Sequence, residues 1–333
     1  MNKRIFRADI LLLITAAVWG FGFVAQRSGM LYVGPFTYNS IRFFLASLSL
    51  LPLIAQRNSR QHDGSDTKAL FFSSFLAGTC LFAGVSLQQI GIMFTTAGNA
   101  GFITGLYVIF TPFIGIFLGR KTGKATWFGA ILTLTGLYFL SSSDQPDKIN
   151  PGDIIVAIGA VFWSFHVLVI DRLVQKTDPI KLSSGQFAFA AFYALIAAFL
   201  AEPFLSQWLA NQAPGIFSSE YTGWKSLPAL ISGLSAGTVP LSLVSDALVP
   251  ILYGGLVSVG IGYTLQVIAQ RDAPPAHTTI ILCLEGCFAA LGGILLLHEP
   301  MRARILLGFI LMLAGMLISQ WELIGGRRKN SFK

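Results

Sequence analysis

Two ionisable side chains lie inside stretches that are otherwise apolar. Arg42 is found within FTYNSIRFFLA, and Glu285 within LEGCFAALGGILLL. An ionisable group at the centre of a membrane helix costs about 2.5 to 3.5 kcal/mol on insertion scales, so it is expected to face a bundle interior or a wet cavity. These two residues are therefore the first candidates for binding chemistry.

Helix geometry predicts how deep the two groups lie in the membrane. Arg42 is about seven residues inside the outer end of the apolar span 35–55, and Glu285 is about nine residues inside the inner end of the span 276–298. At about 1.5 Å per residue in a core of about 30 Å, they differ by only about 5 Å in depth. Either they bind the carboxylate and ammonium of a zwitterionic substrate, or they form a fixed ion pair between helices.

Two tryptophans and a histidine also lie within apolar stretches. Trp19 and Trp163 occupy mid-helix positions, so each indole N–H needs a partner. They form either opposite walls of a cavity or ordinary interhelical contacts. His166, one turn from Trp163, is either a ligand or proton relay, or a neutral hydrogen-bonding core residue.

Uncharged polar residues in the apolar stretches either line a cavity or join helices. Among them, Gln88 and Gln266 lie nearer helix ends than the midplane, which favours contacts between helices. The others are Asn39, Asn99 and Gln186.

The composition belongs to a membrane protein. Of 333 residues, 54% are hydrophobic and 11% are charged, a mixture that a water-exposed surface does not tolerate. A net charge of +8 would suggest nucleic acid in a soluble chain, but the basic residues cluster between apolar runs, where orientation in the bilayer explains them. The predicted class is an all-α polytopic protein that contacts membrane lipid and binds no nucleic acid.

Ten apolar segments of about twenty residues follow one another, each long enough to cross a core of about 30 Å as a helix. With the N-terminus inside, the outer side holds few basic residues, which predicts a multi-pass protein of the cell (inner or plasma) membrane with both termini cytoplasmic. Those outer residues are Arg27, Lys148, Lys225, Arg302 and Arg304. The predicted spans are 9–27, 35–55, 69–92, 98–119, 125–142, 153–172, 180–202, 247–270, 276–298 and 304–323.

The chain contains an internal repeat. Segment 84–118 recurs at 262–296 with a shift of 178 positions, and segment 9–43 recurs at 153–187 with a shift of 144. Matches of Trp19 with Trp163, Gln88 with Gln266 and Asp9 with Asp153 are harder to obtain by chance than apolar matches. The predicted halves are 9–142 and 153–323, and the difference of 34 between the shifts is an insertion in the second half.

Five spans in each half have a geometric consequence. An odd number leaves the second half inserted upside down relative to the first. Inverted repeats related by an axis in the membrane plane characterise secondary transporters, whose halves expose a midplane site to each side in turn. The repeat therefore predicts transport by alternating access.

The insertion, at about 203–246, is predicted to be an outer loop. Its apolar stretch 227–244 contains Pro228 and Pro240, and an eleventh span would place the basic C-terminal tail outside. The loop is either a lid that gathers substrate or a passive connection. Its aromatic residues are expected at the membrane interface: Trp208, Phe217, Tyr221 and Trp224.

Several runs resemble the ten-helix EamA-type family of the drug/metabolite transporter superfamily: AAVWGFGFV, FTYNSIRFFLA, NAGFITGLYVIFTPFIGIFLG, LEGCFAALGGILLLHEP and LLGFILMLAGMLI. The resemblance covers nearly the whole chain outside the insertion. It implies two inverted five-helix repeats, a central cavity and efflux of small metabolites, commonly amino acids and related compounds. Family members often carry Pro after the glutamate of the LE motif, where this chain has Gly286, so the expectation of a proline kink does not carry over.

Glu285 is also a candidate carrier of a coupling proton. Burial in a low dielectric favours the neutral form of a carboxyl group, whereas a uniporter needs no such group. The repeat places Tyr107 opposite Glu285, so this acid has no symmetry mate. The candidate substrate-binding residues are Trp19, Arg42, Tyr107, Trp163, His166 and Glu285.

A polytopic membrane enzyme, such as a lipid-linked transferase, is the alternative class. Phosphate-handling versions need clustered carboxylates to hold a divalent metal, and the closest acidic pairs, Asp63 with Asp66 and Asp144 with Asp147, lie in short polar loops. Cys80, Cys283 and Cys287 lie in apolar segments and are expected to be buried free thiols. The sequence thus predicts a carrier without cofactor or metal, rather than an enzyme.

Overall fold

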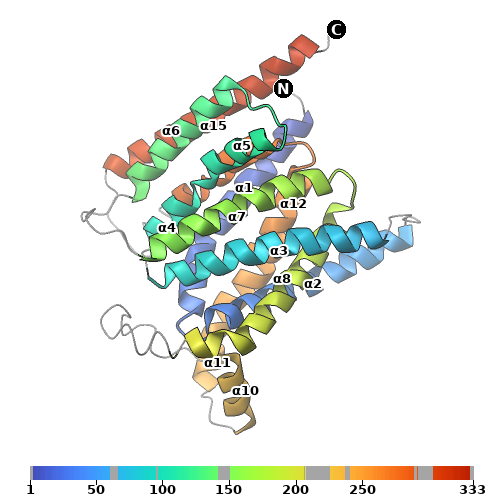
Figure 1. Ribbon diagram of the computed structural model, residues 1–333, viewed down its shortest axis with the longest axis vertical. Coiled ribbons are helices and arrows are strands. Elements are labelled where there is room, and N and C mark those ends of the chain that lie inside the picture. The colour runs from blue at the N-terminus through green and yellow to red at the C-terminus, as the bar shows by residue number, and fades with distance from the viewer. Residues whose placement is uncertain are drawn as a thin grey trace.

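A computed structural model describes residues 3–60, 67–94, 97–141, 151–205, 207, 226–236, 241–288, 291 and 303–330, and within them it is all-helical. Figure 1 shows the helices stacked side by side in one elongated bundle. The elements are α1 (Lys3–Gly29), α2 (Pro35–Arg60), α3 (Thr67–Ile92), α4 (Ala97–Thr104), α5 (Tyr107–Phe117), α6 (Lys124–Ser141), α7 (Pro151–Leu173), α8 (Pro179–Leu200), α10 (Leu227–Ser235), α11 (Leu241–Leu252), η2 (Tyr253–Tyr263), α12 (Thr264–Ala269), α13 (Pro275–Leu282) and α15 (Ala303–Asn330).

Proline residues define several of the helix starts. Pro35, Pro151, Pro179 and Pro275 each occupy the first helical position, where the missing N–H costs nothing and the fixed φ already suits a helix. At α8 the preceding Asp178 adds a side-chain cap, because its Oδ1 accepts from two backbone N–H groups at 2.9 and 3.0 Å. These local signals explain why the predicted and observed starts agree closely there.

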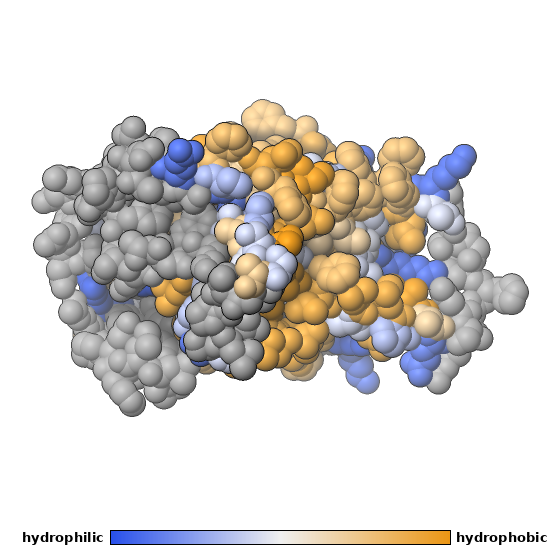
Figure 2. Space-filling view, turned by 90° about the horizontal axis from the view of Figure 1, so that it is seen from below, coloured by the Kyte–Doolittle hydropathy of each residue, from blue (hydrophilic) through white to orange (hydrophobic). Residues whose placement is uncertain are grey.

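The surface carries an apolar belt. Within the described residues, six helices are long and apolar enough to cross a membrane, and two shorter apolar helices accompany them. Large hydrophobic side chains lie on the outside, among them Phe72, Phe117 and Val249, each more than 60% exposed. Figure 2, which looks from below, shows this apolar surface across the middle of the view, with hydrophilic residues towards its left and right sides. So much exposed apolar surface indicates a lipid environment, and the protein is a multi-pass membrane protein.

Helices from the first and second halves of the sequence pack against each other throughout the bundle. Helix α2 lies against α8, α3 lies against α7 and α8, and α6 lies against α15. Helix α1 packs against η2, α12 and α13. The core therefore lies between the predicted halves, which are not separate globular domains.

Two of the predicted spans are each interrupted near their middle. Span 98–119 is divided into α4 and α5 by a tight turn at Gly105–Leu106, and α13 ends at a turn at Cys283–Leu284. These turns fall at equivalent positions of the repeat, since the shift is 178. The backbone tightens in the same way in both, with N–H groups bonding three residues back: Leu106 to Ile103, Val108 to Gly105, Leu284 to Ile281 and Gly286 to Cys283.

The predicted span 247–270 has an internal π-helix. Helix α11 begins at Leu241, continues as η2 from Tyr253 to Tyr263, and ends as α12. Its counterpart in the first half, α3, is an uninterrupted α-helix from Thr67 to Ile92. A π-helix closes hydrogen bonds over five residues instead of four, so it accommodates an extra residue.

Within the insertion, the described residues include the short helix α10 and the start of α11. Helix α10 has nine residues, far fewer than the about twenty needed to cross a bilayer. Glu202 is fully buried, and its carboxylate accepts from the backbone N–H groups of Phe36, Thr37 and Leu227 at 2.9, 3.0 and 3.2 Å. It therefore joins the starts of α2 and α10 to the end of α8. Trp208, Phe217, Tyr221 and Trp224 lie outside the described residues.

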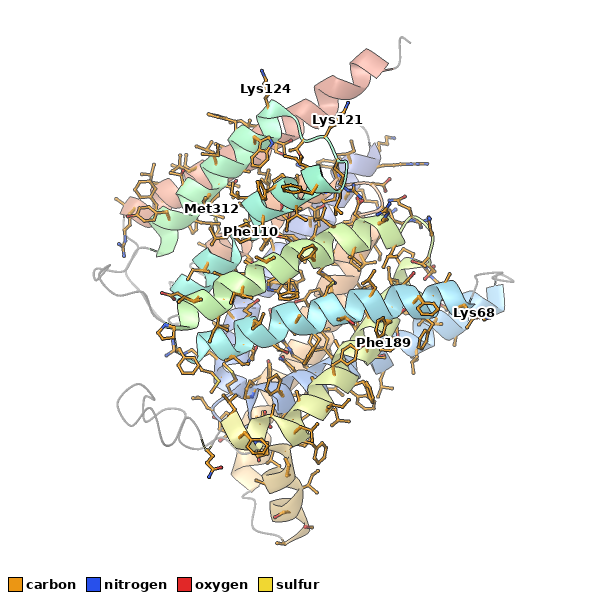
Figure 3. All side chains as sticks on the ribbon, in the orientation of Figure 1. Lys68, Phe110, Lys121, Lys124, Phe189 and Met312 are labelled. Carbon is orange, nitrogen blue, oxygen red and sulfur yellow. The ribbon has the colours of Figure 1, made fainter. Side chains whose placement is uncertain are left out.

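One end of the bundle gathers the termini and several basic residues. Figure 3 shows Lys121 and Lys124 at the end of the molecule where Figure 1 marks both termini. At this end, ion pairs at Arg120–Asp171 and His277–Asp9 each join a residue of the first half to one of the second. We call this the terminal end of the bundle. A third pair, Arg57–Asp178, joins α2 to the cap of α8.

Candidate functional site

A cavity lies among the helices of both halves. Its walls come from α1, α2, α3, α4, α5, α7, η2, α12 and α13, together with the turn that follows α13. The lining residues are Trp19, Phe23, Gln26, Arg42, Val85, Gln88, Thr104, Tyr107, Trp163, Val167, Ser258, Tyr263, Gln266, Leu282 and Glu285. We call it the central cavity.

Most of this lining consists of residues at equivalent positions of the repeat. Twelve of the fifteen lining residues form six such pairs under the shifts of 144 and 178. Gln26, Arg42 and Ser258 have no lining mate; their equivalents are Ile170, Gln186 and Cys80. The pairs are Trp19 with Trp163, Phe23 with Val167, Val85 with Tyr263, Gln88 with Gln266, Thr104 with Leu282, and Tyr107 with Glu285.

Equivalent residues also touch each other directly. The rings of Phe43 and Phe187 lie 6.2 Å apart, and the thiol of Cys283 donates to the carbonyl of Gly105 at 3.5 Å. Both contacts adjoin the central cavity, because Phe43 follows the lining residue Arg42 and Cys283 follows the lining residue Leu282.

Glu285 and Tyr107 are brought together by the two interrupted helices. Each is the first helical residue after the turn, and the hydroxyl of Tyr107 donates to Glu285 Oε1 at 3.5 Å, a long hydrogen bond. Glu285 is 5% exposed. Among the described residues no cation lies within ion-pair distance of its carboxylate. The turn thus directs an uncompensated acid into the cavity.

Arg42 reaches the cavity from α2 and is 2% exposed. Its guanidinium carbon lies 5.2 Å from the ring centre of Tyr38 and 5.1 Å from that of Phe43, so aromatic faces surround the charge. Its Nε has no hydrogen-bond partner, and no carboxylate pairs with it among the described residues. The structure therefore does not show the fixed Arg42–Glu285 ion pair that the sequence left open.

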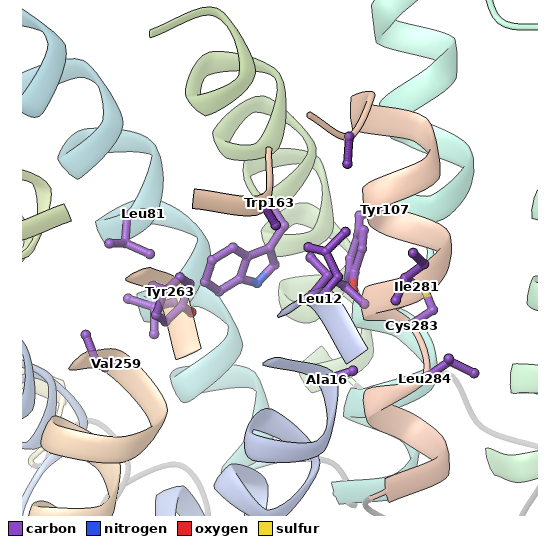
Figure 4. Packing of buried hydrophobic residues seen from close by; sticks show 14 of the residues in the cluster. Leu12, Ala16, Leu81, Tyr107, Trp163, Val259, Tyr263, Ile281, Cys283 and Leu284 are labelled. Carbon is purple, nitrogen blue, oxygen red and sulfur yellow. The ribbon is translucent and has the colours of Figure 1, made fainter. Parts of the chain in front are cut away.

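Aromatic rings form a continuous wall. Tyr263 stacks with Trp163 at 5.9 Å and 17°, and its ring centre lies 4.4 Å from that of Trp19. Figure 4 shows Tyr263, Trp163 and Tyr107 in the same buried cluster. The indole of Trp163 donates to Gln88 Oε1 at 2.9 Å, and that of Trp19 donates to the carbonyl of Ser258 at 3.0 Å. Both indoles are satisfied and line the cavity.

His166 lies behind this wall and does not line the cavity. It is fully buried, its Nε2 lies 2.9 Å from Gln186 Oε1, and its ring meets those of Trp163 and Tyr263 edge-on. Its Nδ1 has no partner among the described residues. In this structure the ring of His166 packs against the aromatic wall from outside the described cavity lining.

Several lining residues escaped the sequence analysis. Gln88 and Gln266 were expected to join helices, yet both line the cavity, and Gln88 also makes the contact with Trp163. Tyr263 contacts both tryptophans and was not singled out. The signal was present, because Tyr263 follows Gly262 just as Val85 follows Gly84 in the repeated stretch. Gln26, Thr104 and Ser258 gave no signal of their own.

Comparison with known proteins identifies the family. The EamA-like transporter family model matches residues 6–142 and 215–320. A relative named as an uncharacterized transporter from Archaeoglobus fulgidus (strain ATCC 49558 / DSM 4304 / JCM 9628 / NBRC 100126 / VC-16) is 27% identical, over 95% of this chain and 87% of its own length. The UDP-xylose transporter 3 of Arabidopsis thaliana is 22% identical, over 61% of this chain and 49% of its own length.

The fold is similar to that of a solved protein. One crystal structure superposes with a TM-score of 0.69 and 15% sequence identity, covering 94% of this chain and 96% of the other. An all-helical membrane bundle, a cavity between its halves and the family match agree with one another. The chain belongs to the EamA-like transporter family.

Proposed function

We propose that this transporter has ten membrane helices in two inverted five-helix halves, 9–142 and 153–323, and moves its substrate by alternating access. Reciprocal contacts support the two-fold relation. Gly84 packs on Trp163, and the equivalent Gly262 packs on Trp19. Gly159 approaches the carbonyl of Gly84, and the equivalent Thr15 donates to the carbonyl of Gly262 at 3.2 Å.

The terminal end supports the inversion. Asp9, near the start of α1, contacts His277, and Asp171, near the end of α7, contacts Arg120. Because Arg120 and His277 line the same cavity, the start of α1 and the end of α7 lie at the same end of the bundle. Helices α1 and α7 are equivalent in the repeat and therefore run in opposite directions. The basic residues of this end favour the cytoplasmic side for both termini.

The substrate we propose is a small zwitterionic metabolite, an amino acid or related compound, moved outward across the cell membrane. The observation that carries this proposal is a pair of opposite, unpaired charges in one cavity. Arg42 suits a carboxylate, because its fork donates two parallel hydrogen bonds, and Glu285 suits an ammonium group. The rings of Trp19, Trp163 and Tyr263 suit an apolar or aromatic side chain.

A nucleotide sugar, as the name of the Arabidopsis relative suggests for that protein, fits less well. A diphosphate needs several cations, and Arg42 is the one lysine or arginine in the described lining. Glu285 would also repel it. A membrane enzyme is the other alternative, and among the described residues no group of three His, Cys, Asp or Glu is placed to hold a metal. Flux across a sealed vesicle marks a carrier, whereas chemical turnover in detergent marks an enzyme.

Counterflow in proteoliposomes tests the charge pair. A metabolite screen comparing overproducing cells with cells that lack the protein first names the substrate and direction. We then expect Arg42→Gln and Glu285→Gln each to weaken apparent affinity by at least about thirtyfold, since each loses a charge-assisted hydrogen bond of about 2 kcal/mol. Arg7→Gln, a change at an exposed arginine of α1, is the matched control. Normal affinity in both cavity variants would refute zwitterion binding.

Proton coupling through Glu285 is tested separately. We expect an imposed pH gradient to drive uptake by the wild type, and we expect Glu285→Gln to exchange substrate without responding to the gradient. A wild type that ignores the gradient would identify a uniporter or another coupling ion.

A further inference from the structure

A second cavity lies at the terminal end. It shares no lining residue with the central cavity. Its walls come from α5, the connection to α6, the first turn of α6, α7 and the start of α13. The lining residues are Thr111, Pro112, Gly115, Arg120, Lys121, Thr122, Gly123, Thr126, Leu168, Pro274, Pro275, Ala276 and His277. We call it the terminal cavity.

Two helix N-termini open on this cavity. Helix α6 starts at Lys124, with Gly123 before it and Thr126 in its first turn, and α13 starts at Pro275. The first N–H groups of a helix have no partner within the helix, and the helix dipole adds a partial positive charge there. At α13, Pro274 and Pro275 have no N–H, so the donors there are the backbone amides of Ala276 and His277. A helix N-terminus is therefore a natural position for an anion, and two of them line one space here.

The charged side chains of the lining are basic. Arg120 and Lys121 line the terminal cavity, and its described lining contains no aspartate or glutamate. Arg120 is paired with Asp171, which offsets its charge. Lys121 is exposed and has no ion-pair partner among the described residues. The net charge that the cavity offers to a ligand comes from Lys121 and the helix termini.

An unpartnered buried hydroxyl is the independent sign of a ligand. Thr111 lines the cavity and is 1% exposed, and its Oγ1 is buried without a hydrogen-bond partner among the described residues. A buried hydroxyl without a partner costs stability, so a ligand that accepts a hydrogen bond from it would be favoured. His277 does not offer a free ring nitrogen to a ligand, because its two ring nitrogens already have partners, Asp9 at 2.9 Å and Ser319 at 3.0 Å.

We propose that the terminal cavity binds a phosphate group, held by the N-termini of α6 and α13, the ammonium of Lys121 and the hydroxyl of Thr111. A phosphate offers enough oxygen acceptors to meet donors from several directions. The group comes either from free phosphate or from the headgroup of an anionic lipid, since both present the same phosphate oxygens. The site is separate from the central cavity and does not depend on what is transported.

Titration calorimetry with inorganic phosphate on the detergent-purified full chain tests the site. We expect saturable binding that Lys121→Gln and the nearly isosteric Thr111→Val each weaken by about tenfold. Lys68→Gln is the matched control, because it removes a lysine from the start of α3, well away from Lys121 in Figure 3. An unchanged melting temperature of each variant shows that its fold is intact.

Nanodiscs distinguish the two sources of phosphate. If a lipid headgroup is the natural ligand, phosphate binding is lost in nanodiscs of anionic phosphatidylglycerol and kept in those of zwitterionic phosphatidylcholine. If free phosphate is the ligand, binding is kept in both. Absence of saturable binding in detergent, or equal binding by wild type, Lys121→Gln and Thr111→Val, overturns the proposal.

Discussion

The third helix of each half makes equivalent packing contacts, but the two helices differ in backbone conformation. In the first half, α3 is a continuous α-helix, and in the second half its equivalent contains the π-helical η2. A methyl group built on Gly78 of α3 would lie 2.9 Å from the carbonyl of Gln186, and one on Gly255 would lie 3.0 Å from the carbonyl of Arg42. Both glycines let the neighbouring second helix approach closely.

These contacts show what the π-helix does. Arg42 and Gln186 are equivalent, but Gly78 and Gly255 are separated by 177 positions, whereas Gly84 and Gly262 further along are separated by 178. The second half therefore carries one extra residue between these contacts, and η2 absorbs it. The two halves keep the same helix contacts although their third helices differ in length by one residue.

The same comparison shows where the halves stop being alike. Residues at equivalent positions form most of the walls of the central cavity, but its two charged residues correspond to uncharged ones. Arg42 corresponds to Gln186, and Glu285 to Tyr107. In the mechanism that we propose, the repeat provides two exchangeable states, and the unmatched charges of Arg42 and Glu285 orient the substrate in each.

Single-residue deletions in the two third helices are expected to have the largest effects, and they test whether η2 absorbs one extra residue. Removing Ala83 from α3 rotates one end of the helix by about 100° relative to the other, so the contacts of Gly78 and Gly84 cannot both survive. We expect loss of the folded peak in size-exclusion chromatography. Removing Ile261 from η2 returns that helix to the length of α3, and we expect a folded protein. Equal tolerance of both deletions would contradict the role given to η2.

Glycine substitutions give an intermediate effect. A methyl group on Gly129 would lie 2.6 Å from the carbonyl of Gly315, and one on Gly136 would lie 2.7 Å from that of Gly308, contacts that the repeat makes equivalent. We expect Gly129→Ala and Gly136→Ala to destabilise by similar amounts, about 1 to 3 kcal/mol. Gly101→Ala, with nothing within 4 Å, is the control. Thermal unfolding measures the effect; a normal melting temperature for both would show that α6 and α15 do not pack this closely.

The smallest expected effect is the difference in stability between Trp163→Phe and Trp19→Phe. Trp163→Phe removes the donor to the side-chain oxygen of Gln88. Trp19→Phe removes the donor to the backbone carbonyl of Ser258, which lies within the helix η2 and so can also accept from a backbone N–H. Because an unsatisfied buried acceptor costs about 1 to 3 kcal/mol, we expect Trp163→Phe to be the more destabilising change. Thermal unfolding of the two variants and of Gln88→Leu with Trp163→Phe measures the difference. An equal loss in both single variants would assign the effect to ring packing alone.

Much of this arrangement was readable from the sequence because polarity is costly in a membrane. Arg42, Glu285 and the tryptophans were conspicuous in apolar runs, and the structure places them in one cavity. The repeat also predicted that Tyr107 corresponds to Glu285, and the two are in contact.

Other features depended on packing that no local pattern reports. The turn at Cys283–Leu284 has no proline to announce it, and the single residue that η2 absorbs is invisible in an apolar helix. Tyr263 has the composition of any core aromatic, and only its contacts with Trp19 and Trp163 distinguish it. His166 looked like a binding residue because of its type, but its partner Gln186 lies on another helix, away from the cavity.

Accessibility of the central cavity tests alternating access most directly. In a chain with Cys80, Cys283 and Cys287 replaced by serine, a single Thr104→Cys places one thiol in the cavity lining. We expect a membrane-impermeant maleimide to label it both in intact cells and in inverted vesicles, with substrate protecting it from either side. Phe113→Cys, on the exposed apolar surface, should stay unlabelled from both. Labelling of Thr104→Cys from one side only, with and without substrate, would contradict the account.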